Sequence, residues 1–204
     1  MAVQTTYPWE TPNPGAAADF AAGLRAQLPV LTTERLTLRA PTLDDFDAYR
    51  DILMSDRAIH MDGPLSREAA WLDFAQCVAN WVLRGHGLWV IEETATGSTL
   101  GFTLICMETG DQEPELGWFL LEEAEGRGFA SEAAAAAKAH GIRTLALPAL
   151  VSYIDRVNTR SIALAEKIGG WADEDAARAL GQDGVIVYRH WPLPETDGGM
   201  EAYA

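Results

Sequence analysis

The sequence predicts an α/β (α+β) domain with one mixed, mostly antiparallel sheet and helices on both of its faces. Three observations lead to this prediction. A strand pattern at residues 36–40 is followed by two helical patterns. A hairpin pattern then joins residues 88–93 to residues 99–107, and from Glu115 to Trp191 strands alternate with helices. The resulting order, β-α-α-β-β-β-α-β-α-β, predicts the mixed sheet.

Residues 1–29 form an arm that precedes the domain. Pro8, Pro12, Pro14 and Gly15 break regular structure in its first half. Residues 16–28 fit one short helix, whose apolar stripe contains Phe20, Leu24 and Leu28. We expect this stripe to pack on the domain or on a partner subunit, which makes a homodimer possible.

Two helices are predicted after the first strand, which ends at Pro41. Thr42 with Asp45 is a capping pattern, and the helix behind it extends to about Met54. Ser66 caps a second helix of about five turns, with a core face formed by Trp71, Phe74, Val78, Trp81 and Val82.

The remaining elements follow in short segments. After the hairpin and a polar loop at residues 108–114, a central strand is predicted at 115–121 and a helix from Ser131 to about His140, which Gly141 caps or interrupts. The elements that follow are a strand at 149–154, a helix at 158–168, an acidic loop at 171–183 and a last strand at 185–191. Residues 193–204 have the composition of a disordered tail.

Charge and hydropathy exclude several functions. The chain carries 30 acidic and 15 basic residues, so the phosphates of nucleic acid would be repelled. The charge suits a cationic or amine-bearing acceptor, and a solvated acidic surface explains it equally well. The apolar runs of the chain are shorter than the roughly 18 residues of a membrane span, and the first residues lack the pattern of a signal peptide. We therefore expect a cytoplasmic protein without a membrane segment.

No metal site is expected from the cysteines and histidines. Cys77 and Cys106 lie far apart without metal-type neighbours, so both are interpreted as buried apolar residues. The four histidines, His60, His86, His140 and His190, are scattered along the chain.

A glycine-rich turn between a strand and a helix is the strongest local signal. Gly126 and Gly128 permit backbone angles that other residues avoid, and the alanine-rich helix begins directly afterwards. The first amides of a helix lack internal partners and lie at the positive end of its dipole. The turn therefore predicts a site for an anion such as phosphate.

The string G126-R127-G128-F129-A130-S131 resembles the acetyl-CoA pyrophosphate loop of the GNAT N-acetyltransferase superfamily, whose signature is Gln/Arg-x-x-Gly-x-Gly/Ala. Gly128 and Ala130 match its last two positions. Glu125 stands where Gln or Arg is usual, and its carboxylate would repel a diphosphate unless it turns away.

Two further segments resemble one branch of that superfamily, which includes the ribosomal-protein alanine and serine N-terminal acetyltransferases. N158-T159-R160-S161, with Ala165, Lys167 and Gly169, is similar to its Asn-x-x-Ser…Lys-x-Gly segment, and residues 31–39 are similar to its opening strand. The resemblance implies a GNAT domain over residues 30–192, with two central strands that splay apart to admit the pantetheine arm of acetyl-CoA. It also implies that the helix resumes after Gly141 and extends to about Leu147.

The resemblance also implies which residues hold the co-substrate, acetyl-CoA. Diphosphate would be bound by the main-chain amides of Arg127, Gly128, Phe129, Ala130 and Ser131. Pantetheine would be bound by the main chain of Phe119 and Leu120, with the Leu120 amide also facing the oxyanion, and by Asn158, which alternatively is only a helix cap.

Two catalytic residues are expected on the same basis. Glu115 would accept the proton of the amine through water, and Ser161 would donate a proton to the leaving thiolate. Glu113, Asp111 and Asp62 are alternative bases, and Tyr153 is an alternative proton donor. His60, Met61 and Asp62 are candidate contacts of the acceptor.

Three functions are consistent with these residues. The first is acetyl transfer from acetyl-CoA to a primary amine, either a protein N-terminus or a small amine. The second is an acyl-CoA-binding domain without turnover, suggested by Glu125. The third is a structural partner in a complex, suggested by the N-terminal arm.

Overall fold

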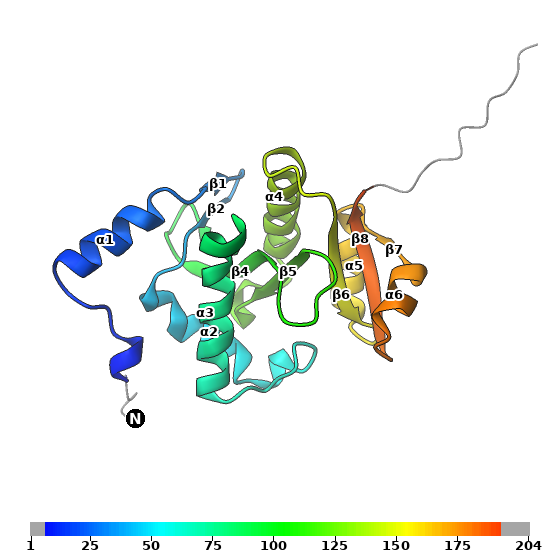
Figure 1. Cartoon of the computed structure of the whole chain (residues 1–204), viewed down its shortest axis with the longest axis horizontal. Coiled ribbons are helices and arrows are strands. Elements are labelled where there is room, and N and C mark those ends of the chain that lie inside the picture. Colours follow the sequence, from blue (N-terminus) through cyan, green and yellow to red (C-terminus); the bar gives the residue numbers. More distant parts are fainter. Residues whose placement is uncertain (1–6, 193–204) are drawn as a thin grey trace, which may run out of the picture.

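The computed structural model describes residues 7–192 (Figure 1). Its strands are β1 (Leu31–Thr32), β2 (Leu36–Arg39), β3 (Leu88–Glu93), β4 (Thr99–Cys106), β5 (Glu115–Leu120), β6 (Leu150–Asp155), β7 (Trp171–Ala172) and β8 (Val185–Trp191). Its α-helices are α1 (Ala16–Arg25), α2 (Phe46–Leu53), α3 (Arg67–Arg84), α4 (Phe129–Arg143), α5 (Thr159–Lys167) and α6 (Glu174–Leu180). Four 3-10 turns add η1 (Pro8–Glu10), η2 (Leu43–Asp45), η3 (Asp56–Ala58) and η4 (Glu122–Ala124).

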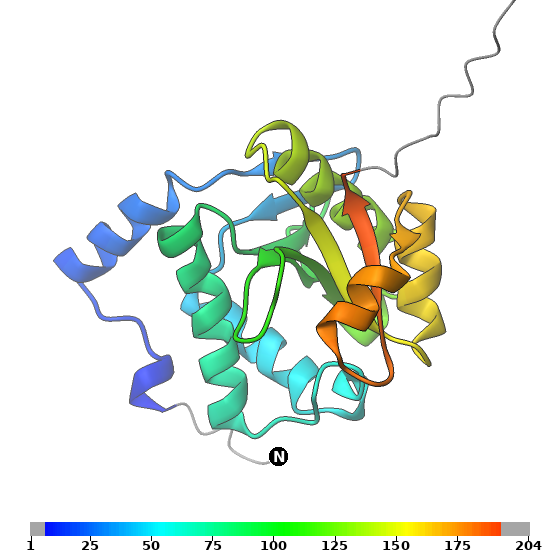
Figure 2. The ribbon, with the colours of Figure 1, turned by 45° about the vertical axis from the view of Figure 1, so that its right-hand side comes forward.

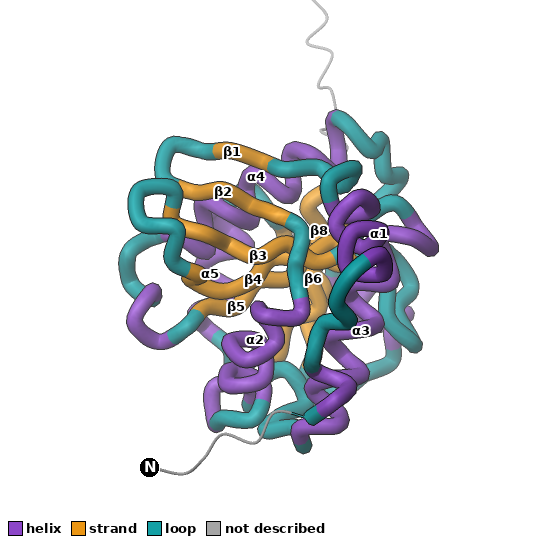
Figure 3. The backbone as a smooth tube through the Cα atoms, turned by 90° about the vertical axis from the view of Figure 1, so that its left-hand side faces the viewer, coloured by secondary structure: helices purple, strands orange, loops and turns teal. Residues whose placement is uncertain are grey.

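The eight strands form one sheet in the order β1-β2-β3-β4-β5-β6-β8-β7 (Figure 3). All neighbours are antiparallel except β5 and β6, which are parallel and share one register pair, Glu115 with Val151. Beyond that pair the two strands part. The mixed, mostly antiparallel sheet and the splayed central strands are thus confirmed.

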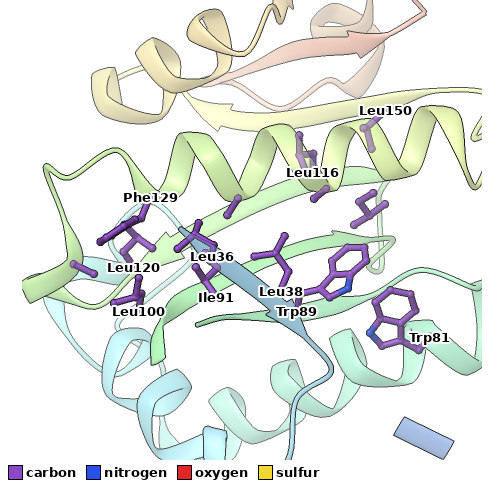
Figure 4. Close-up of a cluster of buried hydrophobic side chains, with 14 residues drawn as sticks. Leu36, Leu38, Trp81, Trp89, Ile91, Leu100, Leu116, Leu120, Phe129 and Leu150 are labelled. Atoms are coloured by element: carbon purple, nitrogen blue, oxygen red, sulfur yellow. The ribbon is translucent and has the colours of Figure 1, made fainter. Parts of the chain in front are cut away.

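Helices cover both faces of the sheet. On one face, Phe129, Ala133 and Ala137 of α4 pack on Leu36 and Leu116 in a cluster that also contains Trp89 (Figure 4). On the other face, α2 and α3 pack on β3 and β4 through a second cluster, which includes Phe46, Tyr49, Phe74, Val90 and Phe102. Each cluster removes apolar side chains from water, and the two together hold β5 by its faces between the helical layers.

Several boundaries differ from those predicted. The α4 helix begins at Phe129, two residues before Ser131, because Gly128 adopts a left-handed conformation and starts it. It continues through Gly141 to Arg143 and does not resume to Leu147. A side chain at Gly141 would meet Ile105 at 2.8 Å, so packing against β4 requires a residue without one.

The segment expected to be an acidic loop at residues 171–183 is instead β7 followed by α6. Asp173 caps α6 by accepting a hydrogen bond from the Ala176 amide at 2.9 Å, and Ala177 is buried against β6 and β8. The acidic composition therefore reflects a solvated helix face and its cap.

The N-terminal arm is attached at both ends and free between them (Figure 2). Glu10 accepts two hydrogen bonds of 2.6 Å from Arg67 of α3. None of the residues of α1 is buried within the described structure, and Phe20 of its apolar stripe is 71% exposed. Of that stripe only Leu28, beyond the helix, packs on the core, so Phe20 and Leu24 do not dock on the domain. The other expectation, that they pack on a partner subunit, stays a prediction.

Two further expectations concern the chain ends and the membrane. The tail at residues 193–204 lies outside the described residues. Within residues 7–192, none of the helices combines the length and the apolar character that a bilayer span requires.

Candidate active site

A cleft of about 1580 Å³ opens where β5 and β6 part. The N-terminus of α4 lies at one end of it and a group of carboxylates around Glu115 at the other. Nine of the ten residues predicted to form the site line it: Glu115, Phe119, Leu120, Gly128, Phe129, Ala130, Ser131, Asn158 and Ser161. Segments distant in sequence are therefore brought to one cavity.

The glycine-rich turn opens α4 toward the cleft. Gly126 and Gly128 have φ angles of 71° and 81°, which only glycine adopts without strain. No described side chain caps the helix, so the first amides of α4 lack a protein partner. A turn of this shape suits the diphosphate of a nucleotide, because amides and dipole both favour an anion.

Arg127 is the predicted residue that does not line the cleft. Its guanidinium donates a hydrogen bond of 3.0 Å to Glu93 and lies over the ring of Phe129, 4.5 Å from the ring centroid. The side chain is thus occupied away from the cavity, and only its main chain lies in the turn.

Two arginines compensate the negative charge of Glu125. Its carboxylate accepts hydrogen bonds from Arg57 of η3 and from Arg160 in the first turn of α5. Both arginines line the cleft, and neither was singled out from the sequence. Arg57 lies in a turn and Arg160 is exposed, so nothing in the local pattern marked them as partners of Glu125.

The open edge of β5 presents the main chain of Leu120, and not that of Phe119, to the cleft, although the Leu120 side chain is buried in the core. The amide of Leu121 bonds to Leu100 of β4 at 2.9 Å, and strand amides alternate in direction, so the main chain of Leu120 faces the gap. The same alternation directs the main chain of Phe119 to β4. The Phe119 ring packs on Tyr49 and Phe102, so this residue contributes its side chain to the core.

Asn158 and Ser161 stand together at the start of α5. Asn158 caps the helix, because its Oδ1 accepts a hydrogen bond of 3.2 Å from the Ser161 amide. The Ser161 hydroxyl itself is half-buried and lines the cleft. The cap uses the main chain of Ser161, which leaves the hydroxyl free for other bonds.

Glu115 occupies a strongly acidic corner. Desolvation, with the neighbouring Asp111 and Glu108 carboxylates, raises the pKa of Glu115 to about 8. Burial raises the pKa of Glu108 to about 7, and it also raises the pKa values of Asp73 and Asp111. A carboxylate with a pKa near 8 is suited to accept a proton at neutral to alkaline pH.

Two of the alternatives, Glu113 and Tyr153, are held by other groups. Glu113 is held by Arg189 through two hydrogen bonds of 2.9 and 2.8 Å. The Tyr153 hydroxyl accepts hydrogen bonds of 3.1 Å from the amides of Gln112 and Glu113, which fix it at the loop. His60 lies at the cleft with its Nδ1 2.8 Å from Asp155, and Met61 and Asp62 line the same wall.

Three acidic or sulfur groups converge that the sequence did not bring together. Atoms of Asp73, Cys77 and Glu108 capable of binding a cation lie within 4.8 Å of one another, and the Tyr49 hydroxyl donates to Asp73 at 2.5 Å. Asp73 and Cys77 are one helical turn apart on α3, but Glu108 reaches them only through the fold. Both cysteines are buried and free, as expected.

Comparison with known proteins identifies relatives across most of the chain. The family model for an acetyltransferase (GNAT) domain matches residues 35–170. The uncharacterised protein YkkB of Bacillus subtilis is 34% identical over 147 residues, which are 68% of this chain and 83% of YkkB.

Solved structures agree with this assignment. An acetyltransferase from Agrobacterium tumefaciens has 42% identity and a TM-score of 0.77, over 81% of this chain and 96% of that one. RimL, a ribosomal L7/L12 α-N-protein acetyltransferase solved with CoA, has 18% identity and a TM-score of 0.61, over 79% and 97%. At 18% identity the likeness to RimL shows the fold alone. With its splayed strands and the matched domain, the chain belongs to the GNAT acetyltransferase family.

Proposed function

We propose that this protein transfers the acetyl group of acetyl-CoA to a primary amine by direct attack within a ternary complex. The observation that supports this most is the cleft itself, which joins the uncapped N-terminus of α4 to the carboxylates around Glu115. One end suits a diphosphate and the other suits a cationic amine. Family membership supports the same class of reaction.

Acetyl-CoA would be held mainly by main-chain groups. The amides of residues 127–131 would bind the diphosphate. The main chain of Leu120, whose carbonyl also accepts a hydrogen bond of 3.3 Å from Arg57, would bond to the pantetheine amides as an added strand does. The Leu120 amide would also donate to the oxyanion that forms on the thioester carbonyl. Asn158 lies beside this path at the start of α5.

Two side chains would carry out the proton transfers of the reaction. Glu115 takes a proton from the ammonium group, directly or through water, and frees the nitrogen lone pair. The amine nitrogen then bonds to the thioester carbon, and collapse of the tetrahedral intermediate breaks the carbon–sulfur bond. Ser161 donates its proton to the departing thiolate and regains one from the acetylated nitrogen through water.

The carboxylates of the cleft favour an acceptor that carries a positive charge. Asp73, Glu108 and Asp111 surround Glu115 on the acceptor side, and burial raises the pKa values of all three. A cationic amine would relieve their mutual repulsion, because it adds a positive charge among groups that cannot all ionise. Both a protein N-terminus, the acceptor class that the name of RimL gives, and a small amine carry this charge.

Acyl-CoA binding without turnover is the second candidate, and Glu125 at a position of the family loop favours it. The ion pairs with Arg57 and Arg160 weaken that argument, since they balance the charge that would repel a diphosphate. The third candidate, a structural partner, is favoured by the exposed apolar residues of α1.

A thiol-release assay separates the three candidates. Wild-type protein is mixed with acetyl-CoA and with either peptides that begin with Ala or Ser or a panel of small amines, and the acetylated product is weighed by mass spectrometry. Amine-dependent thiol release supports the enzyme. Calorimetric binding of acetyl-CoA without thiol release would replace it with the binding domain, and absence of binding would leave only the structural partner.

A further inference from the structure

Where β5 and β6 part, side chains replace the main-chain hydrogen bond that would otherwise join the two strands. The Val151 amide donates to the Pro114 carbonyl at 3.0 Å, which is an ordinary rung of a parallel ladder. The next rung would join the Tyr153 amide to the Leu116 carbonyl. Instead, the Tyr153 amide donates to Glu115 Oε1 at 3.3 Å, and the Ser152 hydroxyl donates to the Leu116 carbonyl at 2.5 Å.

This exchange satisfies both main-chain groups while the strands stay apart. A buried amide or carbonyl without a partner is costly, so a strand pair that opens inside a protein must satisfy the groups it exposes. Glu115 serves the amide of β6, and Ser152 serves the carbonyl of β5. Ser152 is 2% exposed, so water does not readily take its place.

His190 orients the Ser152 hydroxyl. Its Nε2 lies 2.9 Å from Ser152 Oγ, and the ring is fully buried. The only proton of the hydroxyl goes to the Leu116 carbonyl, so Nε2 must carry the hydrogen and donate it to Oγ. The chain of donors therefore runs from His190 through Ser152 to Leu116.

A β-bulge places His190 for this role. Leu150 pairs with Trp191 and Val151 pairs with Arg189, so His190 is the extra residue of β8. The ring packs behind against Gly170, where an added Cβ would lie 2.9 Å from Nδ1. Nδ1 has no hydrogen-bond partner in the described part of the chain, which is consistent with an unprotonated nitrogen. Burial, helped by the charge of Lys138, lowers the pKa of His190 to about 3, so the ring is neutral.

We propose that Ser152, oriented by His190, is a positioning residue that sets where β5 and β6 separate and so seats the pantetheine arm of acetyl-CoA. The inference rests on the proposed function, since the parted strands are where that arm would lie. Without the hydroxyl, the Leu116 carbonyl is left unpaired and is drawn toward the Tyr153 amide. Closing that rung narrows the cleft beside the Leu120 main chain.

The test compares two hydroxyls that serve the same strand. Thr103 of β4 donates to the Gly117 carbonyl of β5 at 2.9 Å, and it is as buried as Ser152, but it lies on the closed, antiparallel side. Ser152→Ala is expected to raise the KM for acetyl-CoA about tenfold while kcat at saturation changes by less than about threefold. Thr103→Val is expected to lower the free energy of unfolding about as much as Ser152→Ala does, but to leave the KM for acetyl-CoA unchanged. Ser152→Thr, which keeps a hydroxyl, restores the KM.

Failure of this inference is distinguishable from failure of the proposed function. Wild-type protein that neither binds acetyl-CoA nor releases thiol overturns both. Wild-type protein that turns over, with Ser152→Ala and Thr103→Val moving the KM for acetyl-CoA equally, overturns only the positioning role. If Ser152→Ala does not fold, His190→Gln and His190→Leu replace it. The glutamine keeps a donor and should preserve the KM, the leucine should raise it, and equal values for the two would reject the role.

Discussion

Arg57 donates a hydrogen bond to Glu125, a residue 68 positions later in the chain, and thereby links η3 to the turn before α4. The same guanidinium donates to the Leu120 carbonyl at 3.3 Å on the open edge of β5. Arg160, in the first turn of α5, donates a further hydrogen bond to the Glu125 carboxylate and adds a second positive charge beside it. The carboxylate that stands at an unusual position in the family loop is therefore part of a small charge network at the mouth of the cleft.

This network predicts that Arg160 acts on CoA through Glu125. Arg160→Ala should weaken CoA binding about fivefold to tenfold, because one positive charge is lost beside the diphosphate site. Adding Glu125→Gln to that variant should recover most of the affinity, since the charge to be balanced is removed as well. Titration calorimetry with CoA measures both. If the double variant binds as weakly as Arg160→Ala, Arg160 contacts the ligand independently of Glu125.

The pH profile should report Glu115. Because the pKa of Glu115 is raised to about 8 and only the ionised form accepts a proton, kcat/KM should increase as the pH rises through about 8. Glu115→Gln should lower kcat/KM on the order of a hundredfold and remove this limb. Glu108→Gln is the matched control, because the Glu108 charge helps to raise the pKa of Glu115. The Glu108→Gln variant should stay active, and its kcat/KM should increase at a lower pH than that of the wild type. A limb that persists in Glu115→Gln would assign the base to another group.

Ser161→Ala should lower turnover more than it alters the affinity for acetyl-CoA. The helix cap survives this change, because Asn158 accepts from the main-chain amide of Ser161 and not from its hydroxyl. Thr159→Ala, on the same turn and exposed, serves as the control and should keep the wild-type rate. The measurement is kcat for thiol release beside the dissociation constant of acetyl-CoA, and an unaltered kcat in Ser161→Ala would remove its role as proton donor.

Acid should release the N-terminal arm before the domain unfolds. The hydrogen bonds from Arg67 hold the pKa of Glu10 below its usual range. A lowered carboxyl pKa contributes stability above the ordinary value, and that contribution is lost as the pH falls through the lowered value. Trp9 packs on Trp71 with centroids 5.0 Å apart, so its fluorescence reports the release.

At neutral pH, Glu10→Gln should reproduce that release, with a cost of about 2 kcal/mol for a buried charge-assisted pair. Asp19→Asn, an exposed acidic residue of α1, should leave the attachment intact. Limited proteolysis of residues 11–29 provides a second measurement. Equal cleavage of wild type and Glu10→Gln would show that the pair does not anchor the arm.

The predictable part of the fold was the part with strong local patterns. The helices α3 and α5, the hairpin of β3 and β4 and the last strand appear where the apolar periodicity and the caps at Ser66 and Asn158 predicted them. The segment of β7 and α6 was not predicted, because its alanine and acidic residues are typical of a solvated loop as well as of a short capped helix.

The candidate site, too, could be predicted only where local patterns determine it. Main-chain features, such as the turn at Gly128 and the cap at Asn158, follow from residue types that local geometry requires. Contacts between distant side chains do not. Arg57 with Glu125 and Ser152 with His190 each join segments at least 38 positions apart, and neither pair has a spacing that a helix or strand would mark.

Titration of CoA into Gly128→Glu tests most directly that the turn before α4 binds the diphosphate. Gly97→Glu, in the turn between β3 and β4, is the matched control, because Gly97 has φ 73° against 81° at Gly128 and both variants strain the backbone alike. Only Gly128→Glu places a carboxylate at the cleft. We predict about tenfold or more weaker CoA binding for Gly128→Glu, equivalent to about 1.4 kcal/mol, and wild-type affinity for Gly97→Glu. A folded Gly128→Glu variant with wild-type affinity for CoA would contradict this prediction.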